Sequence, residues 1–274
     1  MAASELMRSI VEIALAAGQE ILAVYNAEEQ PEVSLKDDSS PLTDADRRAH
    51  RLICERLSAL TPDIPVLSEE SEAEETGVRL SWSRLWIVDP LDGTKEFINR
   101  NGEFTVNIAL VEAGEPVLGV VHVPVSGVTY YGQKNEGANC LSAAENRPIK
   151  VTKLQAEQRL RVVASRSHRG PLVDGLLDSL RTQFEDVELV SMGSSLKICL
   201  LAAGEADLYP RLAPTSEWDT AAAHAVLRAA GGEIIDTGFR PLRYNQRDSL
   251  LNPHFIALAD PSFDWGSRLD SLAE

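Results

Sequence analysis

The sequence changes character abruptly within one short stretch, Leu85-Trp86-Ile87-Val88-Asp89-Pro90-Leu91-Asp92-Gly93-Thr94. The first four residues are apolar, as in a buried strand, and two carboxylates three positions apart follow at once. Pro90 removes a backbone donor and restricts the turn, while Gly93 permits backbone conformations that other residues resist. Oxygen ligands of this kind favour Mg²⁺, Mn²⁺ or Ca²⁺ over zinc. A plain Asx turn at a strand end is the alternative interpretation of the same residues.

Further acidic clusters lie at the ends of other expected elements. Glu69-Glu70 follows an expected strand, and Asp219 follows Trp218 at the start of an expected helix. Thr43-Asp44-Ala45-Asp46 is another helix start, where Asp44 alone is sufficient as a cap. Helix capping is the competing interpretation for Asp219, and a solvated loop is the competing interpretation for Glu69 and Glu70.

Hydrophobic periodicity predicts two helices and a largely antiparallel sheet in the first half of the chain. An apolar stripe from Leu6 to Val24 predicts the first helix, and a second begins near Thr43 or Asp44 and ends before Pro62. The expected strands are Pro65–Ser68, Leu85–Asp89, Thr105–Val111, Val117–Val123 and Val128–Tyr131. Short turns containing Gly and Pro join pairs of these strands as hairpins.

The second half alternates strand and helix instead. Strands are expected at Leu160–Ala164, Val187–Val190, Ala206–Tyr209, Glu233–Ile235 and Phe255–Ala259. Helices are expected at Pro171–Leu180, Ser194–Ala203 and Thr220–Ala230. Such alternation implies a mixed sheet covered on both faces. We therefore expect an N-terminal α+β domain over 1–154 and a C-terminal α/β domain over 155–274.

The composition limits the partners of the chain. In its 274 residues, 42 acidic side chains outnumber 26 basic ones, for a formal charge of −16. This balance disfavours nucleic-acid polymers and anionic membranes, and it disfavours anionic substrates unless bound cations reverse the local field. No apolar run reaches the length of a membrane span, and the first fifteen residues lack the features of a signal peptide. Three scattered cysteines are typical of a cytoplasmic protein with reduced thiols.

Several other catalytic motifs are absent or incomplete in the sequence. There is no P-loop, no dinucleotide-binding glycine motif and no H-E-x-x-H zinc motif. Ser194-x-x-Lys197 matches a pattern of serine acyl hydrolases, but the companion motifs of those enzymes are missing. The acidic clusters therefore remain the main chemical signal.

Taken together, these clusters resemble the Mg²⁺-dependent, lithium-sensitive phosphatases of the inositol monophosphatase family. Asp89–Thr94, Ser68-Glu69-Glu70 and Glu217-Trp218-Asp219 are similar to the family's motifs in order and spacing, and the resemblance covers nearly the whole chain. It implies a layered αβαβα fold that combines α+β and α/β parts. Features that resemble the bisphosphate nucleotidase branch are Ser40-Pro41-Leu42-Thr43, Gly93-Thr94-Lys95-Glu96-Phe97, Ser165-Arg166-Ser167-His168 and Gly193-Ser194-Ser195-Leu196-Lys197.

The resemblance also implies roles for individual residues. The metal ligands, for two or three Mg²⁺ with Mn²⁺ as an alternative, are expected to be Glu69, Asp89, the Leu91 carbonyl, Asp92 and Asp219. Asp46 and Thr94, together with Glu69, are expected to activate the attacking water. Asp44 is an extra carboxylate beside Asp46, and of the two we expect Asp46 to act. The expected substrate contacts are Leu91, Asp92, Gly93, Thr94, His168, Gly193, Ser194, Lys197, Arg211 and Asp219.

The expected reaction is hydrolysis of the 3′-phosphate of adenosine 3′,5′-bisphosphate to AMP, as in sulfate assimilation and nucleotide recycling. Inositol phosphatases carry an acidic residue seven positions before the metal-binding Asp, and this chain has Leu212 there. Inositol monophosphate and sugar bisphosphates remain alternative substrates, and a non-catalytic metal and phosphate sensor is a third possibility. Asp46 and Thr94 argue against a sensor, which has no need to activate water. The resemblance leaves monomer and homodimer open. The expected location is cytoplasmic; peripheral association with the cytoplasmic side of the inner membrane rests on the resemblance only, and an acidic chain without a basic amphipathic helix gives it no support.

Overall fold

The computed structural model describes residues 3–27, 33–35, 41–71, 78–155, 159–164 and 170–269. Its helices are α1 (Ala3–Tyr25), α2 (Asp44–Leu60), the 3₁₀ helix η1 (Arg79–Ser81), α4 (Thr94–Ile98), α5 (Pro171–Arg181), α6 (Leu196–Ala202) and α7 (Glu217–Ala230). No helix in these ranges is long and apolar enough to cross a membrane.

The strands form two large sheets and one short pair. The pair consists of β1 (Val33–Leu35) and β2 (Pro41–Thr43). The seven-stranded sheet contains, in spatial order, β3 (Val66–Ser68), β4 (Arg84–Asp92), β5 (Thr105–Glu112), β6 (Glu115–Val123), β7 (Val128–Gln133), β8 (Gly137–Leu141) and β9 (Asn146–Ile149). The five-stranded sheet contains, in spatial order, β11 (Val187–Ser191), β10 (Leu160–Ala164), β12 (Leu208–Arg211), β14 (Phe255–Leu258) and β13 (Glu233–Asp236).

The two sheets differ in strand direction, as expected from the sequence. In the larger sheet β3 and β4 are parallel, and every later pair is antiparallel. In the smaller sheet β10 runs parallel to β11 and β12, whereas β14 is antiparallel to β12 and β13. The expected antiparallel first half and mixed second half are both confirmed.

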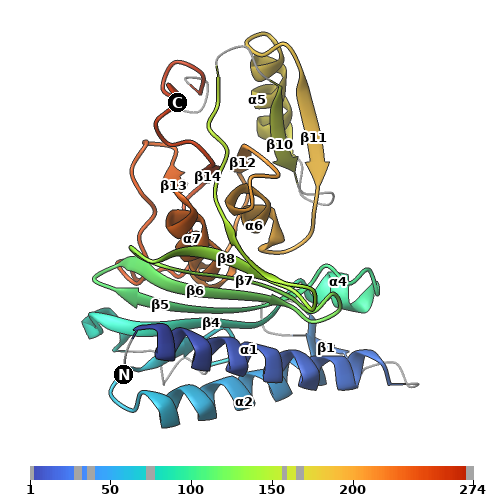
Figure 1. The fold of residues 1–274 in the computed structure, drawn as a ribbon, viewed down its shortest axis with the longest axis vertical. Helices are drawn as coiled ribbons and strands as arrows, with labels where there is room; N and C mark the ends of the chain where they lie inside the picture. Colours follow the sequence, from blue (N-terminus) through green and yellow to red (C-terminus); the bar gives the residue numbers. More distant parts are fainter. Residues whose placement is uncertain are drawn as a thin grey trace.

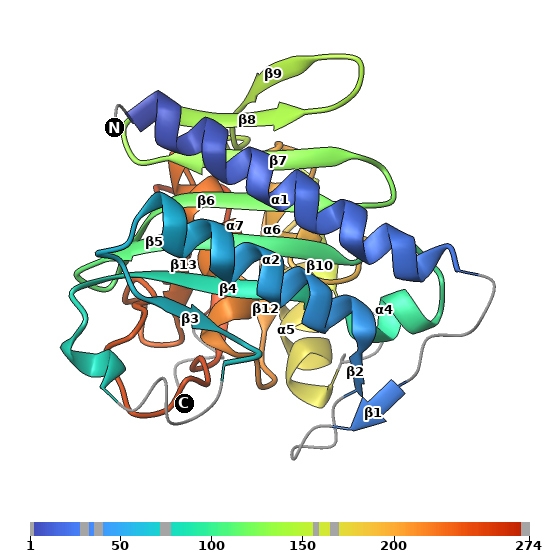
Figure 2. The ribbon, with the colours of Figure 1, turned by 90° about the horizontal axis from the view of Figure 1, so that it is seen from below.

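Helices and sheets alternate in layers. Figures 1 and 2 show α1 and α2 on one face of the seven-stranded sheet, with α6 and α7 between the two sheets. The five-stranded sheet follows, and α5 covers its outer side (Figure 1). One large apolar core joins the two sheets through α6 and α7, and two others lie under α1 and α2 and under α5. The expected αβαβα fold is confirmed.

Alternation along β4 decides which side chains meet α7. Leu85 and Ile87 pack into the core that contains α7, whereas Trp86 and Val88 pack under α1 and α2. The next residue on the α7 side is Asp89. The apolar strand therefore delivers its first carboxylate to the space between the two sheets.

Helix α7 packs unusually closely on the larger sheet. A Cβ atom added to Gly119 of β6 would lie 2.1 Å from the carbonyl oxygen of Ala222 and 2.8 Å from the Cβ of Ala225. Such distances leave no room for any side chain at position 119. The absence of a side chain at position 119 therefore sets how closely α7 approaches the sheet.

Some boundaries differ from the sequence predictions. β4 continues through Pro90 to Asp92, and α7 begins at Glu217 rather than Thr220. The helix predicted over Ser194–Ala203 is regular over Leu196–Ala202 only. Strands β8 and β9 have no counterpart in the prediction. The buried residues of β8 are the small Ala138 and Cys140, and β9 is mostly exposed, so neither carries a strong apolar pattern.

Gly119→Ala is expected to destabilise the protein, because the new methyl group must displace the backbone of α7. The expected loss is about 1–3 kcal/mol in the free energy of unfolding, measured by urea denaturation. Gly175→Ala is the matched control, since Gly175 lies in α5 with nothing within 4 Å of an added Cβ. That control is expected to be as stable as the native protein or about 0.5–1 kcal/mol more stable. Equal stability of the two variants would contradict the close packing of α7.

Candidate metal centre

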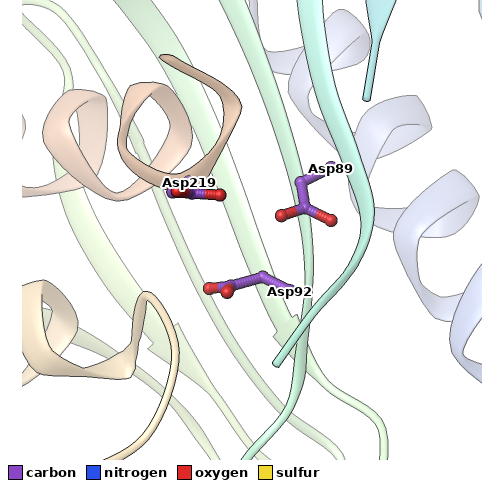
Figure 3. A group of neighbouring side chains, drawn as sticks. All are labelled: Asp89, Asp92 and Asp219. Atoms are coloured by element: carbon purple, nitrogen blue, oxygen red, sulfur yellow. The ribbon is translucent and has the colours of Figure 1, made fainter. Parts of the chain in front are cut away.

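A β-bulge directs Asp89 and Asp92 to the same side of the sheet. In a regular strand, residues three apart point to opposite faces. Here the pairing of β4 with β5 shifts between the pairs Asp89–Asn107 and Asp92–Thr105, so three steps on β4 oppose two on β5. Pro90 and Leu91 occupy the bulge, and the Leu91 N–H donates to Asp89 Oδ1 at 3.0 Å. The Asp-Pro-Leu-Asp sequence thereby becomes a pair of converging carboxylates (Figure 3).

Asp219 joins this pair from the first turn of α7 (Figure 3). Carboxylate oxygens of Asp89, Asp92 and Asp219 all lie within 4.8 Å of one another. The cap of α7 is Ser216, whose backbone N–H donates to Asp219 Oδ2 at 2.7 Å in a capping box. The expectation that Asp219 itself begins the helix is therefore wrong, because the helix starts two residues earlier. One oxygen of Asp219 accepts the Ser216 N–H in the capping box, and the carboxylate faces Asp89 and Asp92 as well.

Glu69 adjoins the three aspartates from the neighbouring strand. Ser68 pairs with Val88 in the parallel β3–β4 ladder, so Glu69 and Asp89 follow at adjacent strand ends. The Glu69 N–H donates to the Val88 carbonyl at 3.0 Å, and the two carboxyl side chains share a hydrogen bond. The structure thus brings four of the five predicted metal ligands together through their side chains, with the Leu91 backbone between Asp89 and Asp92.

Burial, together with mutual repulsion, raises the pKa of the clustered carboxyl groups. Burial raises the pKa of Asp89 well above its ordinary value, and the charges of Glu69, Asp92 and Asp219 add to this effect. Burial, with the charge of Asp92, raises the pKa of Asp219 to about 8. Burial also raises the pKa of Asp92 to about 6, opposed by Lys197 and by the hydrogen bond from Ser195. Ionising all of these carboxyls together is unfavourable without a compensating cation.

This donor set fits a hard divalent cation. Among the described residues the clustered ligand groups are carboxylates, without a histidine or thiolate in the group. Carboxylate oxygens suit Mg²⁺ and Mn²⁺, and a bound cation would offset both the burial of these charges and their mutual repulsion.

The start of α2 separates the roles of its two aspartates. Asp46 is 2% exposed, and its Oδ2 accepts hydrogen bonds from the backbone N–H and the hydroxyl of Thr43. Asp44 instead forms an ion pair with Arg48 at 2.7 Å, and its side chain is 47% exposed. The idea that Asp44 alone caps this helix is therefore wrong, because Thr43 and Asp46 form the capping box.

Thr94 lies at the other end of the bulge. Gly93 has a φ of +92°, a left-handed conformation that favours glycine, and α4 begins directly after it. The Thr94 hydroxyl lies 3.5 Å from the Leu91 carbonyl oxygen. Helix α4 contacts β2, which ends at Thr43 beside Asp46. Thr94 and Asp46 therefore come from two helices, α4 and α2, that both contact β2.

A turn from the second half of the chain closes over these groups. The Gly193 N–H donates to Glu103 Oε2 at 2.7 Å, and a Cβ on Gly193 would lie within about 3 Å of Glu103. The Ser195 N–H donates to Asp92 Oδ2 at 2.5 Å. Ser194 between them has a φ of +44°. The turn over residues 193–195 is therefore attached to the first half at both of its ends.

Two cationic side chains lie near this turn. Lys197 is 8% exposed, and its ammonium lies 5.7 Å from the centre of the Tyr209 ring. Burial lowers the pKa of Lys197 to about 8, although Asp92 opposes this shift. The Arg211 guanidinium donates to the Pro214 carbonyl at 3.1 Å, and its buried Nε has no partner among the described residues. Positive charge and carboxylates thus lie side by side.

His168, the remaining predicted contact, lies outside the described residues. Sequence reasoning also missed several residues that support the site. Glu217 is fully buried at the start of α7, and its Oε2 accepts from the Asn245 N–H at 2.7 Å. Arg79 donates to the Asn245 side chain at 2.9 Å. Thr105 and Asn107 of β5 were missed as well, although the sequence offered a sign of their role: they are polar residues in a largely apolar strand.

Several known proteins are similar to this chain over most of their length. The CysQ 3′(2′),5′-bisphosphate nucleotidases of Salmonella typhimurium and Escherichia coli K12 are each 47% identical to this chain, over 250 and 257 residues, covering 91% of it and 98% of their own length. The crystal structure of CysQ from Bacteroides thetaiotaomicron superposes with a TM-score of 0.82 at 44% identity, covering 93% of this chain and 97% of that one.

A family model covers nearly the whole chain as well. The model of the inositol monophosphatase family matches residues 3–260, which include β4, α7 and every carboxylate described above. This match agrees with the motif order, the layered fold and the convergence of Asp89, Asp92 and Asp219. The chain belongs to the inositol monophosphatase family.

Proposed function

We propose that the chain is a metal-dependent phosphomonoesterase that hydrolyses the 3′-phosphate of adenosine 3′,5′-bisphosphate to AMP and phosphate. The observation that carries the proposal is the placement of Lys197 and Arg211 near the clustered aspartates: Lys197 interacts with Asp92 and Asp219, and Arg211 with Asp219. A bisphosphate carries two phosphate groups, and each needs positive charge nearby. This site offers carboxylates that can hold metal ions for one phosphate and two basic side chains for the other. The similarity to CysQ nucleotidases supports the same substrate.

In this proposal Glu69, Asp89, the Leu91 carbonyl, Asp92 and Asp219 hold two or three Mg²⁺, with Mn²⁺ as an alternative. When bound, the cations supply neutralisation of phosphate charge and stabilisation of the oxygen that leaves. Most of these ligands come from residues 1–154, and residues 155–274 complete the site with Asp219. The carboxylates keep the cations in place and exclude softer metals.

Asp46 and Thr94, with Glu69, orient the attacking water in line with the bond that breaks. The water oxygen forms a bond to phosphorus, the bond from phosphorus to the 3′ oxygen breaks, and that oxygen takes up a proton to become the 3′ hydroxyl. The proton released from the water passes to the solvent or to the released phosphate. The protein side chains position and activate the water and need not become phosphorylated.

The remaining polar groups bind substrate. We assign the reacting phosphate to the backbone N–H groups of Gly93 and Thr94. Residues of the turn and the cationic pair hold the nucleotide and its second phosphate: Gly193, Ser194, Lys197 and Arg211, with His168 as a further candidate. Lys197 suits this role because a buried ammonium gains more from an anionic partner than an exposed one.

Substrate preference tests the proposal directly. Phosphate release with Mg²⁺ is expected to be fastest from adenosine 3′,5′-bisphosphate, compared with inositol 1-phosphate and fructose 1,6-bisphosphate. Preference for either of the latter would contradict the proposed substrate.

Asp92→Asn should lower turnover of every substrate at least 10²-fold even in excess Mg²⁺, because a cation ligand is lost. Near-native turnover of this variant would contradict the metal role of Asp92.

Asp46→Asn and Asp44→Asn form a matched pair. Asp46→Asn is expected to lower kcat about 10²-fold or more, because a neutral amide orients and polarises the attacking water less well than a carboxylate. It keeps an oxygen that can accept from Thr43, so the melting temperature should change little. Asp44→Asn removes a surface ion pair and should leave kcat within about twofold. A larger loss of kcat in Asp44→Asn would reverse the assignment.

The raised carboxyl pKa values predict how pH affects the metal-free protein. Asp92 and Asp219 have pKa values of about 6 and about 8 in the folded state, against an ordinary value of 3.8. At pH values between the ordinary pKa and these raised pKa values, the folded protein holds more protons than the unfolded chain. The free energy of unfolding therefore falls as pH rises from about 4 to about 8. Mg²⁺ should therefore raise the melting temperature more at pH 8 than at pH 6, relative to EDTA. An equal increase at both pH values would refute the electrostatic account.

A further inference from the structure

Two polar residues interrupt the apolar face of β5 that lies between the sheets. Thr105 and Asn107 are 0% and 1% exposed, whereas Ala109 and Val111 continue the same face into the central core. Thr105 and Asn107 pair across the bulge with Asp92 and Asp89. Buried polar side chains require hydrogen-bond partners, and these two find a shared partner in the opposite half of the chain.

That partner is the Ser195 hydroxyl, which is buried against both residues. It donates to Asn107 Oδ1 at 2.9 Å and lies 2.9 Å from the Thr105 hydroxyl oxygen. A hydroxyl has one hydrogen, and that of Ser195 is used on Asn107. The Thr105 hydroxyl must therefore be the donor to Ser195, which gives one directed chain from Thr105 through Ser195 to Asn107. Aligned hydrogen bonds of this kind strengthen one another in a buried setting.

The backbone of the same serine holds a proposed metal ligand. The Ser195 N–H donates to Asp92 Oδ2 at 2.5 Å, and the Thr105 hydroxyl lies 3.5 Å from the same oxygen. Fixing the Ser195 side chain on two β5 residues fixes the direction of its peptide N–H. We propose that Thr105, Asn107 and Ser195 form a positioning relay that orients the Asp92 carboxylate and thereby sets the affinity of the site for divalent cations.

Physical chemistry supports an effect on metal affinity rather than on folding alone. Groups that hydrogen-bond to a metal ligand orient it, and their loss typically lowers metal affinity about 10–100-fold. The amide nitrogen of Asn107 is buried without a hydrogen-bond partner among the described residues, beside the strand position of Asp89. A core built only for stability would carry an apolar residue there, so the unpaired amide points to a role in the site.

The relay also connects cation binding with substrate binding, and this part of the inference rests on the proposed function. Ser195 lies in the turn over residues 193–195, which precedes Lys197, whereas Thr105 and Asn107 lie beside the carboxylates of β4. Movement of this turn would change the hydrogen bond to Asp92. Cation binding and the position of the substrate-binding turn are therefore coupled through the relay.

Isosteric variants separate the relay from general packing. Thr105→Val and Ser195→Ala each remove one hydroxyl, and Thr105→Ser keeps it. Thr129→Val is the matched control, because Thr129 is another fully buried threonine of the same sheet, hydrogen-bonded to His122 away from the site. The measurement is Mn²⁺ affinity of the substrate-free protein, from the EPR signal of free Mn²⁺ during titration.

Thr105→Val and Ser195→Ala are expected to raise the dissociation constant for Mn²⁺ about tenfold or more. Thr105→Ser and Thr129→Val are expected to stay within about twofold of the native protein. Activity lost by the first two variants at low metal concentration should return at high concentration. Native Mn²⁺ affinity in Ser195→Ala, which leaves no large cavity, would overturn the proposal. Because no substrate is present, this result is independent of which phosphomonoester the site hydrolyses.

Discussion

Repulsion among buried carboxylates is the constraint on which the rest of this structure depends. Asp89, Asp92 and Asp219 have oxygens within 4.8 Å of one another, and the pKa of each carboxyl is raised. Such groups stay close together only where the folded backbone fixes the positions and directions of their side chains. The bulge in β4 and the capping box of α7 fix their directions, while Gly119 lets α7 approach the sheet. A bound divalent cation attracts all of these carboxylates at once and so removes the repulsion among them.

The two halves of the chain meet where this charge is concentrated. Asp92 accepts a hydrogen bond from Ser195, and Glu103 accepts one from Gly193, so the second half closes on the first through backbone N–H groups. Lys197 reaches the same region with a pKa near 8. An overall charge of −16 therefore does not determine the field inside the site. That field depends on bound cations and on a small number of buried basic groups.

Sequence patterns predicted long elements well and local roles less well. The apolar periodicity of α1 and the largely apolar runs of β5 and β6 were sufficient to predict these elements, because burial on one helix face or on both sheet faces leaves a recognisable pattern. Edge strand β9 is mostly exposed and leaves no such pattern. The roles of Asp44 and Ser216 were also missed, because any of several polar residues near a helix start can supply the cap. Which of these residues supplies the cap depends on the packing of the folded chain.

The sequence by itself was sufficient to predict the family from motif order, the two kinds of sheet from periodicity, and, through the resemblance, the layered fold and the carboxylates of the site. Only the tertiary structure decided how they are used. It showed that a bulge turns Asp89 and Asp92 to one side, that Asp46 is buried while Asp44 faces solvent, and that Ser195 holds Asp92. These relations join residues up to 103 positions apart. Hydrogen bonds and charges over such separations depend on distances in space, which spacing along the chain does not encode.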